Sequence, residues 1–238
     1  MSLDQIRVEG YKSLRALGVD LLPINVLIGA NGAGKSNFVS LFRLLNRIVE
    51  KNLQLYVAQE GGADALLHLG RKVTESITIN LNFGRNAYRC VLEPTVDDRL
   101  FFSQEVIYYH GTGFAQPWNL MLDQGHRESK LPDEATGPGN RIAKYVLGHL
   151  LSWQVYHFHD TSDSAGVKQA ADTNDNAYLR RDASNLAAFL FRLRASARSN
   201  YDAIRDSIRL VAPFFDDFVL RPSDENKKKI RLEWRELR

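Results

Sequence analysis

Residues 29–37 read GANGAGKSN, and this stretch determines the class of fold that the sequence predicts. It places Gly29, Gly34, Lys35 and Ser36 at the fixed positions of the pattern G-x-x-x-x-G-K-[ST]. Glycines allow successive backbone N–H groups to turn toward one anion. A lysine supplies a mobile cation for phosphate oxygens, and a serine hydroxyl is a ligand for Mg²⁺. The stretch therefore predicts a nucleotide-binding phosphate loop with a magnesium ligand at Ser36.

The segments on either side of the loop match what this mechanism needs. Before it, residues 24–28 read INVLI, a continuous apolar run that predicts a buried strand. After it, apolar residues recur at the spacing of one helix face, at Phe38, Leu41, Phe42, Leu44, Leu45 and Ile48. The start of a helix offers unpaired N–H groups and the positive end of a dipole to a phosphate. Strand, loop and helix together predict an α/β protein.

The rest of the chain predicts four further segments. Residues 73–110 alternate apolar and polar side chains, which predicts an antiparallel β-lobe. Residues 111–140 are rich in glycine, proline, aspartate and serine, and they predict an irregular insertion. Residues 141–212 predict a helical lobe that includes a strand at 153–158, and residues 213–238 predict the start of a second sheet.

Composition narrows the classes of function. The chain has 238 residues, of which 44% are hydrophobic and 25% are charged, as in an ordinary globular protein. Its net charge of +3 is too small to indicate nucleic-acid binding by itself. The single cysteine, Cys90, excludes an internal disulfide and fits a reducing compartment. Because no apolar run approaches the length of a membrane span and charges occur early at the N-terminus, we expect a cytoplasmic protein without a membrane partner.

Four stretches of the sequence resemble a known family of ATPases. Residues 6–14 (IRVEGYKSL) and 25–37 (NVLIGANGAGKSN) resemble the first turn and the phosphate loop of RecF-, SMC- and OLD-like ABC-type ATPases. Residues 156–162 (YHFHDTS) and 185–187 (NLA) resemble the branch of predicted AAA-type ATPases, AAA_15 or AAA_21. The resemblance implies a P-loop NTPase of the ABC-head type, α/β in class, with an antiparallel β-lobe and a helical lobe.

The resemblance also implies a cofactor, partners and a set of site residues. In such proteins ATP and Mg²⁺ lie between two heads, hydrolysis separates the heads, and family members act on DNA in repair or in defence against phages and plasmids. Some carry a nuclease domain or work with an effector subunit. The residues that would contact the phosphates are Asn31, Gly32, Ala33, Gly34, Lys35, Ser36 and Asn37, with Ser36 on Mg²⁺. Lys12 and Ser13 would lie near a phosphate or the edge of the base.

Two polar residues occupy the place of a glutamine that the family uses to join its lobes. His159 and Asp160 follow the predicted strand at 153–158, and either could contact Mg²⁺ or the attacking water. The alternative is that they form a strand-end pair that caps a loop. The sequence predicts no firmer catalytic residue.

The motifs that complete hydrolysis in this family are missing after the phosphate loop. We find no apolar strand that ends in an Asp-Glu pair, and no Ser-Gly-Gly-like signature. Residues 155–160 resemble the apolar strand with its acidic end only weakly. The Asp-Glu pair in residues 223–225 (SDE) is predicted to lie in a turn. We therefore expect an incomplete head, the N-terminal portion of a longer ATPase. The alternatives are a nucleotide-binding regulatory subunit that does not hydrolyse ATP, and the ATPase module of an OLD-like nuclease whose nuclease domain lies beyond residue 238.

Arginines gather in the second half of the chain and leave two interpretations open. They are Arg180, Arg181, Arg192, Arg194, Arg198, Arg205 and Arg209. Such a cluster on neighbouring helix faces could follow a DNA backbone. Aspartates at 182, 202 and 206 alternate with the arginines, which favours a solvated helix face instead.

Overall fold

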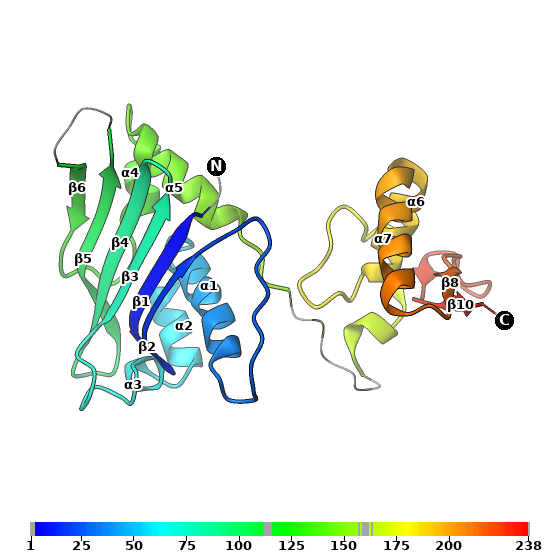
Figure 1. The fold of residues 1–238 in the computed structure, drawn as a ribbon, viewed down its shortest axis with the longest axis horizontal. Coiled ribbons are helices and arrows are strands. Elements are labelled where there is room, and N and C mark those ends of the chain that lie inside the picture. Colours follow the sequence, from blue (N-terminus) through cyan, green and yellow to red (C-terminus); the bar gives the residue numbers. More distant parts are fainter. Residues whose placement is uncertain (1–2, 112–115, 157, 159–161, 163, 238) are drawn as a thin grey trace. The chain divides into compact units, whose positions relative to one another are not determined.

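The computed structural model describes residues 3–111, 116–156, 158, 162 and 164–237. The chain divides into two compact units, Met1–Trp153 and Gln154–Arg238 (Figure 1). Each unit has its own buried cluster of hydrophobic side chains, so each is described by itself.

The first unit is built on one antiparallel sheet of six strands in the order β2-β1-β3-β4-β5-β6. The strands are β1 (Gln5–Tyr11), β2 (Leu14–Asp20), β3 (Ile77–Phe83), β4 (Asn86–Pro94), β5 (Leu100–Tyr109) and β6 (Trp118–Asp123). In β3 every second residue is buried, from Ile77 to Phe83. This alternation is the pattern of a strand with one face on the core, and it confirms the prediction of an antiparallel lobe.

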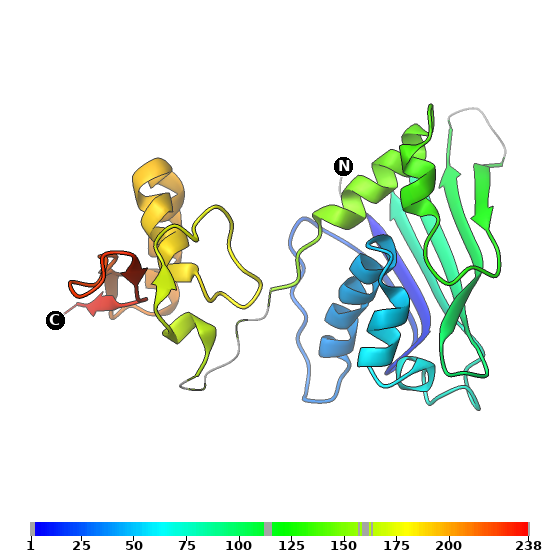
Figure 2. The same cartoon turned by 180° about the vertical axis from the view of Figure 1, so that it is seen from behind.

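Helices cover one face of this sheet, as Figures 1 and 2 show from opposite sides. They are α1 (Lys35–Val49), α2 (Leu53–Gln59), α3 (Ala63–Leu66), α4 (Leu131–Thr136) and α5 (Arg141–Ser152). The predicted apolar face of α1 is confirmed, because Leu41, Leu44, Leu45 and Ile48 are fully buried in the core below the sheet. Each such side chain contributes roughly 1.5–3 kcal/mol through burial. The core therefore fixes α1, and with it the position of the phosphate loop.

A buried carboxylate holds the segment between β6 and α4 against the sheet. Glu105 on β5 is 0% exposed and accepts hydrogen bonds from the Tyr88 hydroxyl at 2.7 Å and the Ser129 hydroxyl at 2.6 Å. The backbone N–H of Lys130 donates to the same carboxylate at 2.8 Å, and the His126 Nε2 lies 2.9 Å from it. Sequence analysis predicts an irregular insertion over 111–140, whereas the structure has β6 and α4 there. The difference arises because strand pairing and this network act between residues distant in sequence.

The predicted strand before the phosphate loop is not formed. Residues 21–30 have neither helix nor strand, and the side chains of Ile24, Val26 and Ile28 are 83%, 76% and 91% exposed. A strand needs hydrogen-bonding neighbours and a covered face. Within the described part of the chain no segment pairs with residues 24–28. The apolar run therefore stays in an extended loop next to the sheet edge at β2.

The second unit is smaller and mostly helical in its centre. Its elements are η1 (Gly166–Lys168), β7 (Ala171–Asp172), α6 (Leu186–Ser196), α7 (Arg198–Val211), β8 (Phe215–Phe218), β9 (Lys229–Ile230) and β10 (Trp234–Glu236). Helices α6 and α7 lie within the range 141–212 that the sequence predicts to be a helical lobe. The strand predicted at 153–158 is absent from its described residues. In the parts of the chain that the structure describes, no helix is long and apolar enough to cross a membrane.

Candidate nucleotide site

The phosphate loop has the backbone shape that its glycines predict. Gly32 and Gly34 have φ angles of 84° and 90°, in the left-handed region that favours glycine. A Cβ on Gly34 would lie 3.0 Å from the Ser13 hydroxyl oxygen, so a side chain there is also crowded. Gly34 ends the loop, and α1 begins at Lys35. These two glycines therefore let the chain turn tightly into the helix.

The start of α1 is open to an anion. No side chain caps it, and its first turn contains no acidic residue. Its unpaired N–H groups and the positive end of its dipole therefore remain available to a ligand. Ser36 lies exposed in this first turn, where its hydroxyl can reach a metal beside a bound phosphate. The donor set, one lysine with backbone N–H groups and one hydroxyl, fits a triphosphate with Mg²⁺.

Lys35 lies across its own loop. Its Nζ donates to the backbone carbonyl of Gly29 at 2.7 Å and to that of Ala30 at 2.8 Å. The ammonium group therefore lies against the first two residues of the loop. Both acceptors are uncharged carbonyl oxygens, so these hydrogen bonds do not neutralise the positive charge of Lys35.

The turn between β1 and β2 supports the other side of the loop. Asn37 Nδ2 donates to the Ser13 hydroxyl at 2.7 Å, and the Tyr11 hydroxyl lies 2.9 Å from that of Ser40. Burial of Tyr11 raises the pKa of its phenol well above the usual value. The structure thus brings Ser13 into contact with Asn37, the last residue of the loop.

Lys12, the residue before Ser13, is paired with an acidic side chain. Its Nζ forms an ion pair with Glu60, at the end of α2, at 2.7 Å. Its backbone N–H donates to the Leu66 carbonyl at 2.8 Å, and its carbonyl lies 2.6 Å from His68 Nδ1. Lys12 therefore fixes the turn against α2 and α3, while its neighbour Ser13 contacts the loop. Glu60 is a residue of this site that sequence reasoning missed, because the pair joins residues 48 positions apart.

Within the described ranges, no acidic side chain is hydrogen bonded or ion-paired to residues 29–37. The candidates His159 and Asp160 lie outside the described residues. A search of the described residues also finds no group of three or more His, Cys, Asp or Glu side chains that could hold a metal.

Most of the clustered arginines are neutralised by aspartates. Arg198 lies 3.1 Å from Asp202, and Arg205 lies 2.8 Å from the same carboxylate. Arg209 contacts Asp216 at 3.0 Å, and Arg180 contacts Asp175 at 2.6 Å. This geometry favours the solvated helix face over a continuous track for a DNA backbone.

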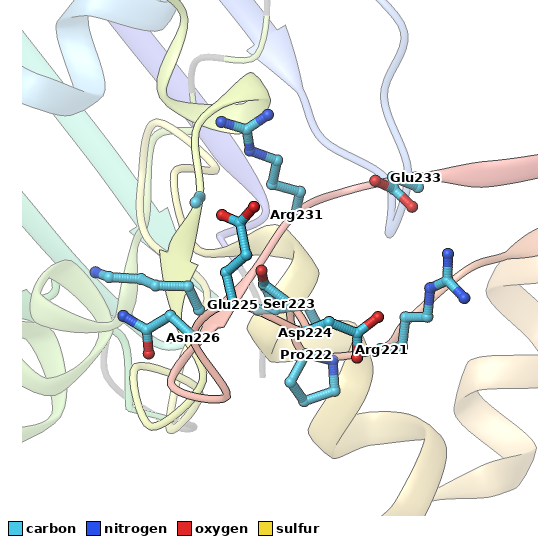
Figure 3. A pocket seen from close by; sticks show the side chains of 11 residues that line it. Arg221, Pro222, Ser223, Asp224, Glu225, Asn226, Arg231 and Glu233 are labelled. Atoms are coloured by element: carbon cyan, nitrogen blue, oxygen red, sulfur yellow. The ribbon is translucent and has the colours of Figure 1, made fainter.

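A separate hollow of about 510 Å³ lies in the second unit, around the hairpin that ends in β9 (Figure 3). Its charged side chains carry both signs: Arg221, Lys229 and Arg231 with Asp224, Glu225 and Glu233. Asp224 is already paired with Lys227 at 2.7 Å. The balanced charges select neither an anion nor a cation, so we assign no ligand to this hollow.

Comparison with known proteins gives a protein family and similar solved structures. The profile of the protein family described as "AAA ATPase domain" matches residues 1–179. A solved structure from work described as "Structural biochemistry of ATP-driven dimerization and DNA stimulated activation of SMC ATPases" has a TM-score of 0.35 and 16% identity. The match covers 61% of this chain and 91% of that chain. At this TM-score it adds nothing to the family match, and no curated protein matches the sequence.

Proposed function

Because the chain belongs to the family of AAA ATPase domains, we propose that residues 31–37 bind the triphosphate of ATP with Mg²⁺. The observation that carries this proposal is the position of Lys35, whose ammonium group faces the carbonyls of Gly29 and Ala30 beside an uncapped helix start. A phosphate oxygen carries more negative charge than a carbonyl oxygen, so it attracts the ammonium group more strongly. Phosphate therefore replaces the carbonyls as the acceptor of Lys35.

Each residue of the loop has a distinct task in this proposal. Gly32 and Gly34 let backbone N–H groups converge on the phosphates. Lys35 neutralises negative charge on the β- and γ-phosphates. Ser36 is the side chain that would hold Mg²⁺, which supplies charge neutralisation at the β- and γ-phosphates when bound. Ser13 holds the Asn37 side chain through their 2.7 Å hydrogen bond, and so stabilises the first turn of α1.

We propose that hydrolysis of the bond between the β- and γ-phosphates needs a carboxylate other than those of the described residues around the loop. Support comes from the lack of an acidic contact to residues 29–37 within the described ranges. In the complete protein a second head would cover the exposed loop, and DNA repair or defence against phages and plasmids would be the process served. A nuclease domain or effector subunit would then use the cycle of ATP binding. The same lack of a carboxylate favours a second candidate, a regulatory subunit in the cytoplasm that binds ATP and does not hydrolyse it.

Equilibrium binding of ATP with Mg²⁺ tests the site, measured by calorimetry on the whole chain. We expect Lys35→Ala to weaken binding by roughly tenfold to a hundredfold, because it removes a hydrogen bond from a charged donor, worth about 1.5–3 kcal/mol. The matched control is Lys51→Ala, an exposed lysine just beyond the other end of α1 that pairs with Asp133. Equal binding by the wild type and Lys35→Ala would rule the site out.

Release of phosphate from ATP separates the two candidate functions. Hydrolysis that depends on Lys35 would identify a carboxylate within the chain, and Asp160 would be the first residue to replace. Binding without turnover in the isolated chain, with turnover restored by a longer protein, would support the incomplete head. Binding without turnover in any longer protein would favour the regulatory subunit.

A further inference from the structure

A second candidate site lies in the second unit and shares no residue with the phosphate loop. It is a hollow of about 710 Å³, which is the size of a small-ligand site. The side chains of interest around it are Tyr156, Tyr178, Arg180 and Arg181, with Gln154 at its edge. We call it the tyrosine–arginine hollow.

Its two tyrosines expose flat aromatic surface to solvent. Tyr178 is 68% exposed and Tyr156 is 41% exposed. The ring of Phe158, itself 56% exposed, lies 5.5 Å from that of Tyr156 at an angle of 34°. A neighbouring apolar hollow of about 560 Å³ includes Phe158 and shares Leu179 and Asp182 with the first. Exposed aromatic side chains therefore line two hollows that share residues, and exposed apolar surface gathered in one place is typical of a binding site.

The wall that carries Tyr178 is rigidly held. Asn185, which is 0% exposed, accepts a hydrogen bond from the Arg180 backbone N–H at 2.8 Å. Its amide nitrogen donates to the carbonyls of Asp175 at 2.9 Å and Tyr178 at 2.8 Å. One buried side chain thus fixes the backbone at three points, which gives the NLA stretch at 185–187 a physical role. The surface is built before any ligand arrives.

Besides Arg180, the hollow carries one cationic and one anionic side chain, Arg181 and Asp182. Arg180 is paired with Asp175 at 2.6 Å, and the Asp182 carboxylate accepts from the Ser184 backbone and hydroxyl. Arg181 has no acidic partner among the described residues, and its Nε donates to the neutral Gln154 side chain at 3.1 Å. The remaining N–H groups of Arg181 are free to meet a phosphate.

We propose that the tyrosine–arginine hollow binds a short stretch of single-stranded nucleic acid, with bases stacked on Tyr178 and Tyr156 and one phosphate on Arg181. Aromatic side chains stack with any base because every base has a π-face, and unpaired bases are the ones that can be reached. A duplex buries its base faces and presents many phosphates, which one arginine cannot match. The stacking geometry therefore favours single strands.

Fluorescence anisotropy of a labelled oligo(dT) with the whole chain tests the proposal, with oligo(rU) as the matched RNA arm. We expect Tyr178→Ala to raise the Kd roughly fivefold to a hundredfold, the range expected for loss of one base–aromatic stack. Tyr178→Phe should bind like the wild type, because it keeps the ring. The matched control is Phe214→Ala, an aromatic residue of the same unit that is 56% exposed. Circular dichroism confirms that each variant is folded.

The dependence on salt tests the role of Arg181. One phosphate contact to a single strand predicts a slope of about −0.7 for the logarithm of the affinity against that of the salt concentration. Arg181→Ala should remove this slope, while Arg198→Ala should leave it unchanged because Arg198 is paired with Asp202. A slope several times steeper would mean a binding surface built from many cations, and would overturn the proposal.

Other outcomes would overturn it as clearly. These are no binding of either oligonucleotide by the wild type, equally tight binding of duplex DNA, and equal losses for Phe214→Ala and Tyr178→Ala. Competition with AMP separates a free nucleotide from a strand. Displacement of the oligonucleotide by AMP at concentrations near the Kd for the strand would identify a mononucleotide site instead. Lys35→Ala should bind the oligonucleotides normally, so failure of the ATP site and failure of this one are distinguishable.

Discussion

Two apolar stretches of the first unit have opposite fates. β3 pairs with β1 on one side and β4 on the other, and its Ile77, Ile79 and Leu81 are fully buried. Residues 24–28 are as apolar as β3, yet they form no strand and are exposed. Hydrophobic composition alone therefore does not make a strand in this protein, because a strand also needs a hydrogen-bonding neighbour and a covered face.

The patterns of the two stretches explain the difference. β3 alternates apolar with polar residues, so one covered face is enough to bury its apolar side chains. Residues 24–28 are almost continuously apolar, a pattern typical of strands that are covered on both faces. The first unit covers only one face of its sheet with helices, so it cannot bury a strand of this second kind.

The largest loss of stability is expected from a charge placed in β3, the buried one of the two stretches. We expect Leu81→Asp to destabilise the first unit by about 4 kcal/mol or more, because an unpaired carboxylate would replace a side chain with 0% exposure. Urea denaturation followed by tryptophan fluorescence measures this change in the free energy of unfolding. A loss below about 1 kcal/mol would mean that β3 is not part of the core.

Removal of the buried carboxylate is the next largest effect. We expect Glu105→Ala to cost about 3 kcal/mol, because it leaves the Tyr88 and Ser129 hydroxyls and the Lys130 N–H without their acceptor. The same urea titration measures it, with Glu75→Ala, an exposed residue just before β3, as the control. Similar losses for the two variants would show that the network contributes no net stability.

Alkaline pH should lower the free energy of unfolding of the first unit through Tyr88, which lies opposite Leu81 on β4. Burial and the neighbouring Glu105 raise the pKa of Tyr88 well above the value of 10.0 that it has in the unfolded chain. Its stabilising effect is therefore complete below pH 10, and it falls as pH rises, by about 1.4 kcal/mol per pH unit until the folded protein also titrates. Urea midpoints on both sides of pH 10 measure the loss. Tyr88→Phe should show a smaller dependence on pH, and an unchanged dependence would contradict the assignment.

The smallest loss of stability is expected from the same kind of substitution in the exposed stretch, residues 24–28. We expect Val26→Asp to change the free energy of unfolding by no more than about 0.5 kcal/mol, because Val26 is 76% exposed. The measurement is the one used for Leu81→Asp, which makes the two variants a matched pair. A cost near that of Leu81→Asp would mean that residues 24–28 are buried in solution.

Local patterns predicted the elements whose contacts are themselves local. The alternation in 73–110 and the helical spacing from Phe38 to Ile48 identified β3 to β5 and α1, and the glycines identified the phosphate loop. Long-range contacts escaped prediction. The pairing of β6 with β5 and the ion pair between Lys12 and Glu60 join residues whose own neighbours carry no sign of the partner. The burial of Glu105 has the same cause, since the hydroxyl groups that donate to its carboxylate come together only in the folded protein.

The lysine of the phosphate loop has a consequence for how quickly a nucleotide can be taken up. The Lys35 ammonium group rests on the Gly29 and Ala30 carbonyls, so its side chain is already held at the loop. When a nucleotide binds, its phosphate oxygens replace the two carbonyls as hydrogen-bond acceptors of Lys35. The lysine side chain then needs no separate ordering step. Association should accordingly follow the rate of encounter, and differences in affinity among nucleotides should arise chiefly from how slowly each of them departs.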